Sequence, residues 1–192
     1  MEALFGVFTA FGLSASAGLN AYIPLLVVAL LAKFTDLIVL TPPWDTLESW
    51  WIIGLLTVLL GIEFFADKVP AVNHINDILQ TFVRPVAGAI AFAASAGVVT
   101  DVHPVLALAA GLLIAGGVHT VKSAAVRPAV TATTGGAGNV PVSILEDIVS
   151  TVTSVLAIVL PILIAAIIIV VTALALYLIW RRYNRERKTI PS

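Results

Sequence analysis

Apolar residues form six long blocks along the chain, separated by short polar segments. The blocks cover residues 3–34, 50–66, 85–100, 104–120, 128–158 and 160–180. A helix needs roughly 20 mostly apolar residues to cross the hydrocarbon core of a bilayer. The runs are continuous, whereas the strands of a transmembrane barrel alternate apolar and polar positions. The pattern predicts an all-α, polytopic helical membrane protein with about six transmembrane spans.

Two blocks, 3–34 and 128–158, are too long for one ordinary span. As a straight helix each would measure roughly 47 Å, against a hydrocarbon core of about 30 Å. We expect the first and fifth spans to be interrupted helices. The alternative is that each block folds into a hairpin of two short helices.

Basic residues decide between these topologies. The last block ends in "WRRYNRERK", and the positive-inside rule places this tail in the cytoplasm. With six crossings, both termini are cytoplasmic and only Lys33 among the basic residues is external. The hairpin alternative would place four basic residues outside, Lys68, Arg84, Lys122 and Arg127, and leave six of the ten inside. We therefore expect a single transmembrane domain over residues 1–182, followed by a basic cytoplasmic tail over residues 183–192.

The segment 66–84 connects the second and third blocks and has its own helical pattern. Apolar residues recur at helical spacing opposite a set of amide and acidic side chains in "DKVPAVNHINDILQTFVR". This predicts an amphipathic helix at the cytoplasmic interface. An unstructured loop is the alternative.

Internal repeats are suggested by two similar segments. "FTAFGLSASAGLNAYIPLL" (8–26) aligns with "RPAVTATTGGAGNVPVSIL" (127–145), and residues 84–108 share features with both. Each of the first two passes from small and hydroxyl residues through glycine to asparagine, proline and aliphatic residues. Repeats that frame a central site are common in transporters, although Ala/Gly-rich helices also resemble one another by chance.

Both long blocks contain polar islands where a helix break is expected. In the fifth block these are Gly135, Gly136, Gly138 and Pro141, with Thr131, Thr133, Thr134 and Asn139 available to bond the freed backbone. In the first block they are Ser14, Ser16, Gly18, Asn20 and Pro24. We expect the two breaks to face each other and to bind a substrate or ion through Ser16, Asn20, Thr134 and Asn139. Alternatively, the small residues Ser14, Gly18, Ala107, Gly111 and Ala115 serve only close helix packing.

Carboxylates inside apolar runs are the second group of candidates. Glu63 and Asp67 share a helix face at i, i+4, and Glu146 and Asp147 follow the second break. Such residues mark functional sites by default. They could bind a cation or relay protons, with partners among Arg84, Lys122, Arg127 and His119. The alternative is a set of buried ion pairs that fixes helix register.

The dipeptide Arg-Pro occurs twice, at Arg84-Pro85 and Arg127-Pro128. Proline is favoured at the first helical position, so both dipeptides are expected at helix starts. The arginines would then mark the cytoplasmic interface or, together with Lys122, bind an anionic lipid headgroup.

Composition narrows the function classes. The chain is 60% hydrophobic and 11% charged, with a net charge of −1 and no cysteine. A net charge near zero gives no positive electrostatic field that would attract nucleic acid. The absence of cysteine excludes disulfides and thiolate chemistry. No zinc-ligand spacing, phosphate-binding loop or nucleophile elbow occurs. We therefore expect no enzymatic activity, no cofactor and no metal site.

Three stretches carry a family resemblance: "SAGLNAYIPLL", "EFFADKVPAVNHINDILQTFVRPVAGA" and "VHTVKSAAVRPAVTATTGGAGNVPVSILEDI". Together they resemble the integral-membrane family named domain of unknown function 4126 (DUF4126), up to about residue 182. The resemblance implies a small multi-pass protein of the bacterial inner membrane. It implies no activity and no functional residues.

We expect a transporter or channel for a small solute or ion. Anionic-lipid binding or flipping and a non-transporting membrane scaffold are the alternatives. Faces rich in small residues suggest a homo-oligomer in the bilayer, most simply a dimer.

Overall fold

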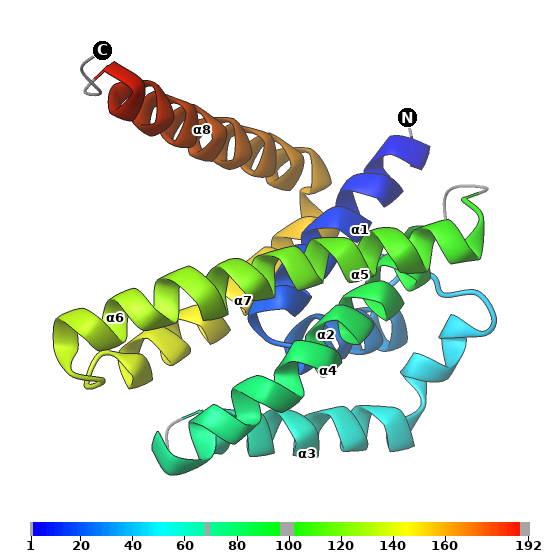
Figure 1. The fold of residues 1–192 in the computed structure, drawn as a ribbon. Helices are drawn as coiled ribbons and strands as arrows, with labels where there is room; N and C mark the ends of the chain where they lie inside the picture. Colours follow the sequence, from blue (N-terminus) through cyan, green and yellow to red (C-terminus); the bar gives the residue numbers. More distant parts are fainter. Residues whose placement is uncertain (1, 68–69, 97–101, 189–192) are drawn as a thin grey trace.

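Every regular element in the described part of the chain is a helix (Figure 1). The computed structural model describes residues 2–67, 70–96 and 102–188. Lys68 and residues 189–192 of the predicted basic tail lie outside these ranges. The all-α prediction is confirmed. The elements are α1 (Glu2–Leu19), α2 (Tyr22–Phe34), the 3₁₀ turn η1 (Trp44–Glu48), α3 (Trp50–Ala66), α4 (Pro70–Ala96), α5 (Pro104–Val121), the π-helical turn η2 (Lys122–Val126), α6 (Arg127–Thr134), α7 (Asn139–Val159) and α8 (Pro161–Lys188).

The exterior of the helices is apolar, as expected for a protein in lipid. Among the described residues, three helical segments are long and apolar enough to cross a membrane: Ile78–Ala96, Pro104–Thr134 and Asn139–Val159. Shorter apolar helices cover Phe5–Leu19, Tyr22–Phe34 and Trp50–Ala66. Large apolar side chains on several of these helices are exposed, such as those of Trp51, Leu113 and Leu145. This is a helical membrane protein.

The first long block is interrupted, but it does not continue in one direction. The break falls at Asn20 and Ala21, between α1 and α2. Phe5 and Thr9 of α1 line the same cavity as residues 36–39, which follow α2, so the chain turns back at the break. The expectation of a single interrupted span over 3–34 is therefore corrected to two short helices. With this correction the N-terminal end of α1 lies at the same end of the bundle as the loop after α2.

The second break, at residues 135–138, separates two membrane-spanning segments instead of interrupting one. Residues 104–134 run on as one helical segment, because the π-helical turn η2 joins α5 to α6 without a loop. Gly135 and Gly136 then adopt positive φ angles of 63° and 92°, and the chain reverses into α7 (Figure 1). The break is thus a turn between two spans rather than an interruption within the predicted span 128–158.

The predicted interfacial connector is part of a longer helix. α4 begins at Pro70 and continues through Pro85 to Ala96, so residues 70–84 and the third apolar block form one element. Arg84 therefore lies within a helix instead of at its start, and its side chain is buried. Burial of the apolar half of α4 against α1 and α5 overrides the helix-start preference of proline.

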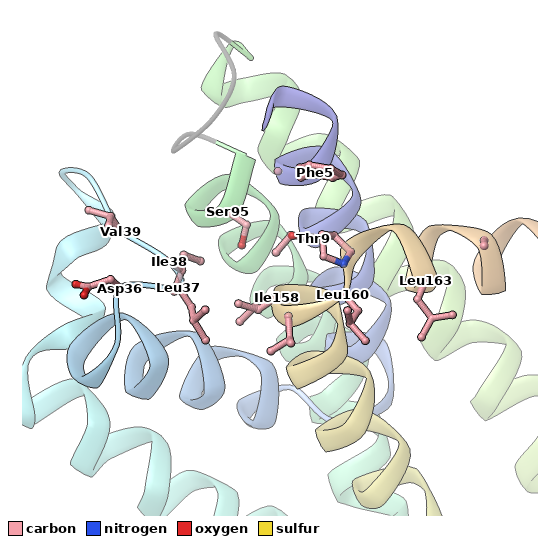
Figure 2. Close-up of a pocket in the computed structure, with 14 residues that line it drawn as sticks. Phe5, Thr9, Asp36, Leu37, Ile38, Val39, Ser95, Ile158, Leu160 and Leu163 are labelled. Atoms are coloured by element: carbon pink, nitrogen blue, oxygen red, sulfur yellow. The ribbon is translucent and has the colours of Figure 1, made fainter. Parts of the chain in front are cut away.

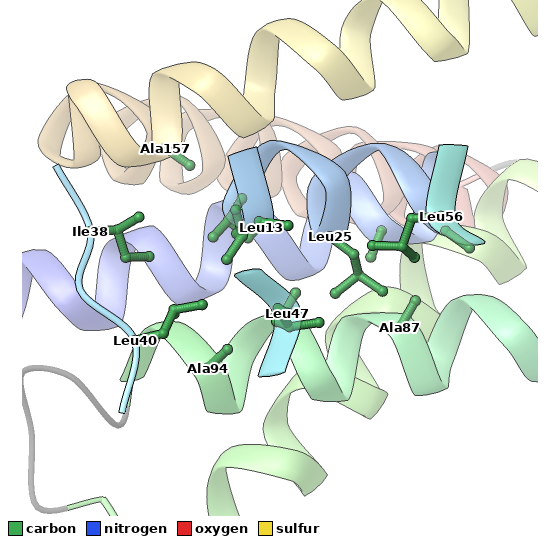
Figure 3. Close-up of a cluster of buried hydrophobic side chains, with 14 of the residues drawn as sticks. Leu13, Leu25, Ile38, Leu40, Leu47, Leu56, Ala87, Ala94 and Ala157 are labelled. Carbon is green, nitrogen blue, oxygen red and sulfur yellow. The ribbon is translucent and has the colours of Figure 1, made fainter. Parts of the chain in front are cut away.

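Small residues allow α1, α4 and α5 to approach closely at the centre of the bundle. A Cβ atom on Gly88 would lie 2.2 Å from the Ala115 Cβ, and one on Gly111 would lie 2.3 Å from the Gly88 carbonyl oxygen. Ser14 donates a hydrogen bond to that same carbonyl at 2.8 Å. The predicted packing role of these small residues is confirmed. The main apolar core lies beside this contact and includes Leu13, Leu25, Leu47, Leu56 and Ala87 (Figure 3).

Candidate functional site

A cluster of buried charged side chains lies between the end of α1 and the residues Glu146 and Asp147, about two turns into α7. Its innermost pair joins α3 to α4: Arg84 Nη2 donates to Glu63 Oε1 at 2.8 Å, and both side chains are 1% exposed. Arg84 Nη1 also lies 3.2 Å from His119 Nδ1 of α5, and Thr81 Oγ1 lies 3.1 Å from His119 Nε2. One buried arginine therefore connects three helices.

The π-helical turn η2 builds the second part of the cluster. Its hydrogen bond runs from the Arg127 N–H to the Lys122 carbonyl, an i→i+5 bond that places residues five apart on one face. Lys122 Nζ and Arg127 Nη2 consequently reach the same carboxylate oxygen, Glu146 Oε2, at 2.8 and 2.7 Å. In a regular α-helix these two side chains would point about 140° apart.

Arg127 is shared between two carboxylates. Its Nη2 atom lies 2.7 Å from Glu146 Oε2 and 3.6 Å from Asp67 Oδ2. Asp67 also accepts hydrogen bonds from Ser143 Oγ at 2.8 Å and from Asn76 Nδ2 at 2.7 Å. A small displacement of the Arg127 guanidinium would bring it closer to Asp67 than to Glu146.

The first helix break joins this cluster through Asn20. The Asn20 Oδ1 atom accepts from the N–H groups of Tyr22 and Ile23 at 3.0 and 3.1 Å, which caps the start of α2. Its Nδ2 atom donates to Asp147 Oδ1 at 2.9 Å. Lys122 Nζ donates to the Leu19 carbonyl at 3.0 Å, at the last residue of α1. Asn20 and Lys122 thus bond backbone groups freed by the break, and Asp147 of α7 holds the Asn20 side chain.

The cluster is closely paired, as the cost of buried charge requires. An isolated ion in a low-dielectric interior costs several kcal/mol, and a pair compensates for this only with good geometry and further hydrogen bonds. Among the described residues, buried atoms without a hydrogen-bond partner include Glu63 Oε2, Arg84 Nε and Glu146 Oε1. Such atoms carry a desolvation cost that the ion pairs around them must offset.

A line of hydroxyl groups leads away from the cluster between α1 and α7. Ser16 Oγ lies 2.8 Å from Ser150 Oγ and 2.7 Å from Ser154 Oγ, and all three side chains are buried. Farther along, Thr9 Oγ1 donates to the Ala157 carbonyl at 2.8 Å. That carbonyl cannot receive the usual i+4 bond, because Pro161 has no N–H. We call this contact between α1 and α7, from Asn20–Asp147 to Thr9–Ala157, the polar seam.

The polar seam ends at a cavity of about 1040 Å³. Figure 2 shows it between the first half of α1, residues 36–39, Ser95 of α4 and the junction of α7 with α8. Its walls are mainly apolar, and Thr9, Ser95 and Asp36 supply the polar groups. From Thr9 to Asn20 the helix rises about 16 Å. The cavity and the charged cluster therefore lie at opposite ends of the seam.

The structure brings most of the predicted site residues together. Asn20, Asp147, Glu146, Glu63, Asp67, Arg84, Lys122 and Arg127 all belong to the cluster, and Ser16 lies in the seam. The predicted partners of Glu146 include Lys122 and Arg127, and both contacts are confirmed. The basic side chains are buried against carboxylates inside the bundle.

Thr134 and Asn139 lie elsewhere. Thr134 Oγ1 accepts from the Gly138 N–H at 2.9 Å, and Asn139 Nδ2 donates to Thr131 Oγ1 at 3.1 Å, all within the exposed turn. The predicted bonding of the freed backbone by Thr134 is confirmed. The expectation that the two breaks face each other is wrong, because Asn20 meets α7 at Asp147, about 12 Å along the helix from Asn139.

Sequence reasoning missed the serines of α7. Ser143, Ser150 and Ser154 lie on one face with Asp147, at spacings of four, three and four residues, and all three serines are fully buried. The same spacing relates Thr9, Leu13, Ser16 and Asn20 on α1. The recurrence of serine, threonine, asparagine and aspartate at helical spacing, interrupted on α1 by Leu13, was the available signal.

Comparison with known proteins gives one match. Neither the curated proteins nor the solved structures contain a match to this chain. The family model described as "Domain of unknown function (DUF4126)" matches residues 7–181, which include the whole cluster and the seam, and the chain belongs to this family.

Proposed function

We propose that this membrane protein is a transporter or channel for a small solute or ion, and that the polar seam is the route between the cavity and the charged cluster. The observation that carries the proposal is the alignment of polar contacts between α1 and α7. Hydroxyl and amide groups recur over about 16 Å of this contact, on both sides of the buried Leu13, with a cavity at one end and buried carboxylates at the other. Ionisable side chains within membrane-spanning segments are costly and often mark ion and proton pathways.

The shared arginine suggests how movement is coupled to an ion. A proton or alkali cation bound at Glu146 weakens the pull of this carboxylate on Arg127. The guanidinium then shifts toward Asp67, its second partner at 3.6 Å. Because Arg127 begins α6, Asp67 follows α3 and Glu146 lies in α7, the exchange moves three helical elements relative to one another. Packed contacts with two discrete arrangements are the usual basis of such transitions.

We also propose that the cluster end of the bundle faces the cytoplasm. Arg84, Lys122 and Arg127 all lie there, whereas Lys33 lies near the other end, where it donates to the Glu48 carbonyl at 2.8 Å. The positive-inside rule favours this orientation. The N-terminal end of α1 then lies on the external face.

Ion flux into vesicles tests the proposal. The purified protein is reconstituted into liposomes with a trapped pH-sensitive dye, and proton flux is driven by a valinomycin potential. Sodium and potassium fluxes are followed separately with tracer. We expect a flux of at least one of these ions above that of protein-free liposomes, and its loss in Asp147→Asn and Glu146→Gln.

The matched control is Asp45→Asn, which neutralises an exposed carboxylate in η1. It should keep the wild-type flux. All variants are compared only if they elute from size-exclusion chromatography like the wild type. A wild-type flux no greater than that of empty liposomes for all three ions, or a flux unaffected by both cluster variants, would overturn the proposal.

A further inference from the structure

A second cavity opens on the outside of the bundle, between α5, η2, α7 and α8. Its volume of about 830 Å³ is within the range of about 300–1,000 Å³ typical of small-molecule sites. The lining residues include Leu113, Val121, Val149, Val171 and Leu176, and these apolar side chains are exposed. In a bilayer this groove is open to acyl chains, so an apolar part of a ligand can enter from the lipid.

Two charged residues lie among the groove's described lining, Lys122 and Glu146. Lys122 Nζ donates to Glu146 Oε2 at 2.8 Å and to the Leu19 carbonyl at 3.0 Å. An ammonium group has three donors, so these bonds leave one. Glu146 Oε1 is buried without a hydrogen-bond partner among the described residues, and the Glu146 side chain is only 10% exposed. The pair therefore offers one donor and one acceptor side by side.

The charge balance at this point limits the headgroup. Lys122 and Arg127 face Glu146 and Asp67, so two cations meet two carboxylates. A purely anionic headgroup would find no excess positive charge here. A headgroup that carries both an anion and a hydrogen-bond-donating cation matches both open positions, with its anion at Lys122 and its ammonium group at Glu146.

We propose that this groove binds a zwitterionic aminophospholipid, with its phosphate at Lys122, its primary ammonium at Glu146 and its acyl chains along α5, α7 and α8. A phosphatidylcholine has the same charge but a quaternary ammonium without N–H groups. It cannot donate to Glu146 Oε1, so the site distinguishes the two lipids. The inference does not rest on transport, and the flux experiment leaves it unaffected.

Gly117 provides a variant that tests the groove without disturbing the cluster. It lines the groove, and a Cβ atom added there would meet no atom within 4 Å. Gly117→Phe therefore fills the groove without a backbone clash. Gly61 on α3 is the matched control, because a Cβ there also meets no atom within 4 Å and Gly61 does not line the groove. Both changes replace a helical glycine by phenylalanine and have similar effects on helix propensity.

Native mass spectrometry of the detergent-solubilised protein measures the binding. Phosphatidylethanolamine, phosphatidylcholine and phosphatidylglycerol with the same acyl chains are titrated separately. For the wild type and Gly61→Phe we expect one bound phosphatidylethanolamine, with about tenfold higher affinity than phosphatidylcholine. Gly117→Phe should lose this binding, and Glu146→Gln should lose the preference for the primary amine.

Three results would overturn the proposal: equal affinity for all three lipids, tightest binding of phosphatidylglycerol, or unchanged binding by Gly117→Phe. The last of these does not depend on Glu146→Gln being able to fold.

Discussion

The two helix breaks have similar sequences and very different surroundings. Asn20 and Asn139 occupy aligned positions after small and hydroxyl residues, and each lies next to the start of a helix. Asn20 is buried and bonds both α2 and Asp147, whereas the turn before Asn139 is exposed and bends at Gly135 and Gly136. At the first break the Asn20 side chain stabilises the change of direction through its hydrogen bonds. At the second break the change of direction depends on the positive φ angles of Gly135 and Gly136.

This difference shows which break belongs to the charged cluster. The polar groups of the buried break need partners, and Asn20 together with the charged side chains of Lys122 and Asp147 supplies them. The exposed turn bonds its own backbone through Thr134 and recruits no charge. Asn20 and Asn139 lie in similar sequences, but only Asn20 joins the charged cluster, because the fold places Asp147 next to it.

The largest loss of stability is expected on replacing Lys122, the charged residue that bonds the first break. Lys122→Met removes a buried cation that bonds both Glu146 and the Leu19 carbonyl. Breaking a buried ion pair leaves an uncompensated charge, so we expect the free energy of unfolding to fall by about 3–5 kcal/mol. Chemical unfolding in detergent micelles measures this. Lys33→Met, at a half-buried lysine outside the cluster, should cost no more than about 1 kcal/mol. Similar losses for the two variants would contradict the account.

The two asparagines allow a direct comparison of the breaks. Asn20→Ala removes the cap of α2 and the hydrogen bond to Asp147, which together should cost about 2–4 kcal/mol of unfolding free energy. Asn139→Ala removes only contacts to the exposed Thr131 and should cost less than about 1 kcal/mol. Thermal unfolding of the pair in the same detergent tests this order, and equal costs would show that the breaks are equivalent.

The smallest effect is expected at the backbone of the second break. Gly135 has a φ of 63°, where a side chain costs about 1–2 kcal/mol, so Gly135→Ala should destabilise the protein by this amount. Asparagine tolerates the left-handed region better, and Gly135→Asn should lose less than the alanine variant. A Cβ at Gly135 would meet no atom within 4 Å, so any loss reports backbone conformation. A greater loss for asparagine would contradict this explanation.

The sequence predicted the helical class, the positions of both breaks and the residues of the charged cluster. Each of these depends on local information: apolar runs, glycine and proline, and carboxylates inside apolar segments. Lys122 and Arg127 are two of the four partners expected for Glu146 and Asp147, beside Arg84 and His119, and the structure pairs both with Glu146.

The path of the chain could not be predicted in the same way. An apolar block of about 30 residues has the same composition whether it crosses once or turns back at Asn20. Lys122 and Arg127 suggest a loop in the sequence, yet they lie in a continuous helix because Glu146 and Asp67 compensate their charge. Arg84 within α4 is buried for the same reason, through Glu63 of α3. Long-range pairing decides these cases, and local pattern does not contain it.

Water access to the polar seam tests the central claim most directly. The chain has no cysteine, so single cysteine variants can be labelled without background. Ser150→Cys places a thiol in the seam, and Val152→Cys places one two residues along α7 at an exposed apolar position. A water-soluble methanethiosulfonate reagent is applied to the protein in membranes, and the labelling rates are compared. The thiolate is the reactive form, and it does not form in acyl chains. We predict that Ser150→Cys is labelled and that Val152→Cys is not. Labelling of neither residue would mean that the seam stays dry and packed, and would contradict a translocation route between α1 and α7.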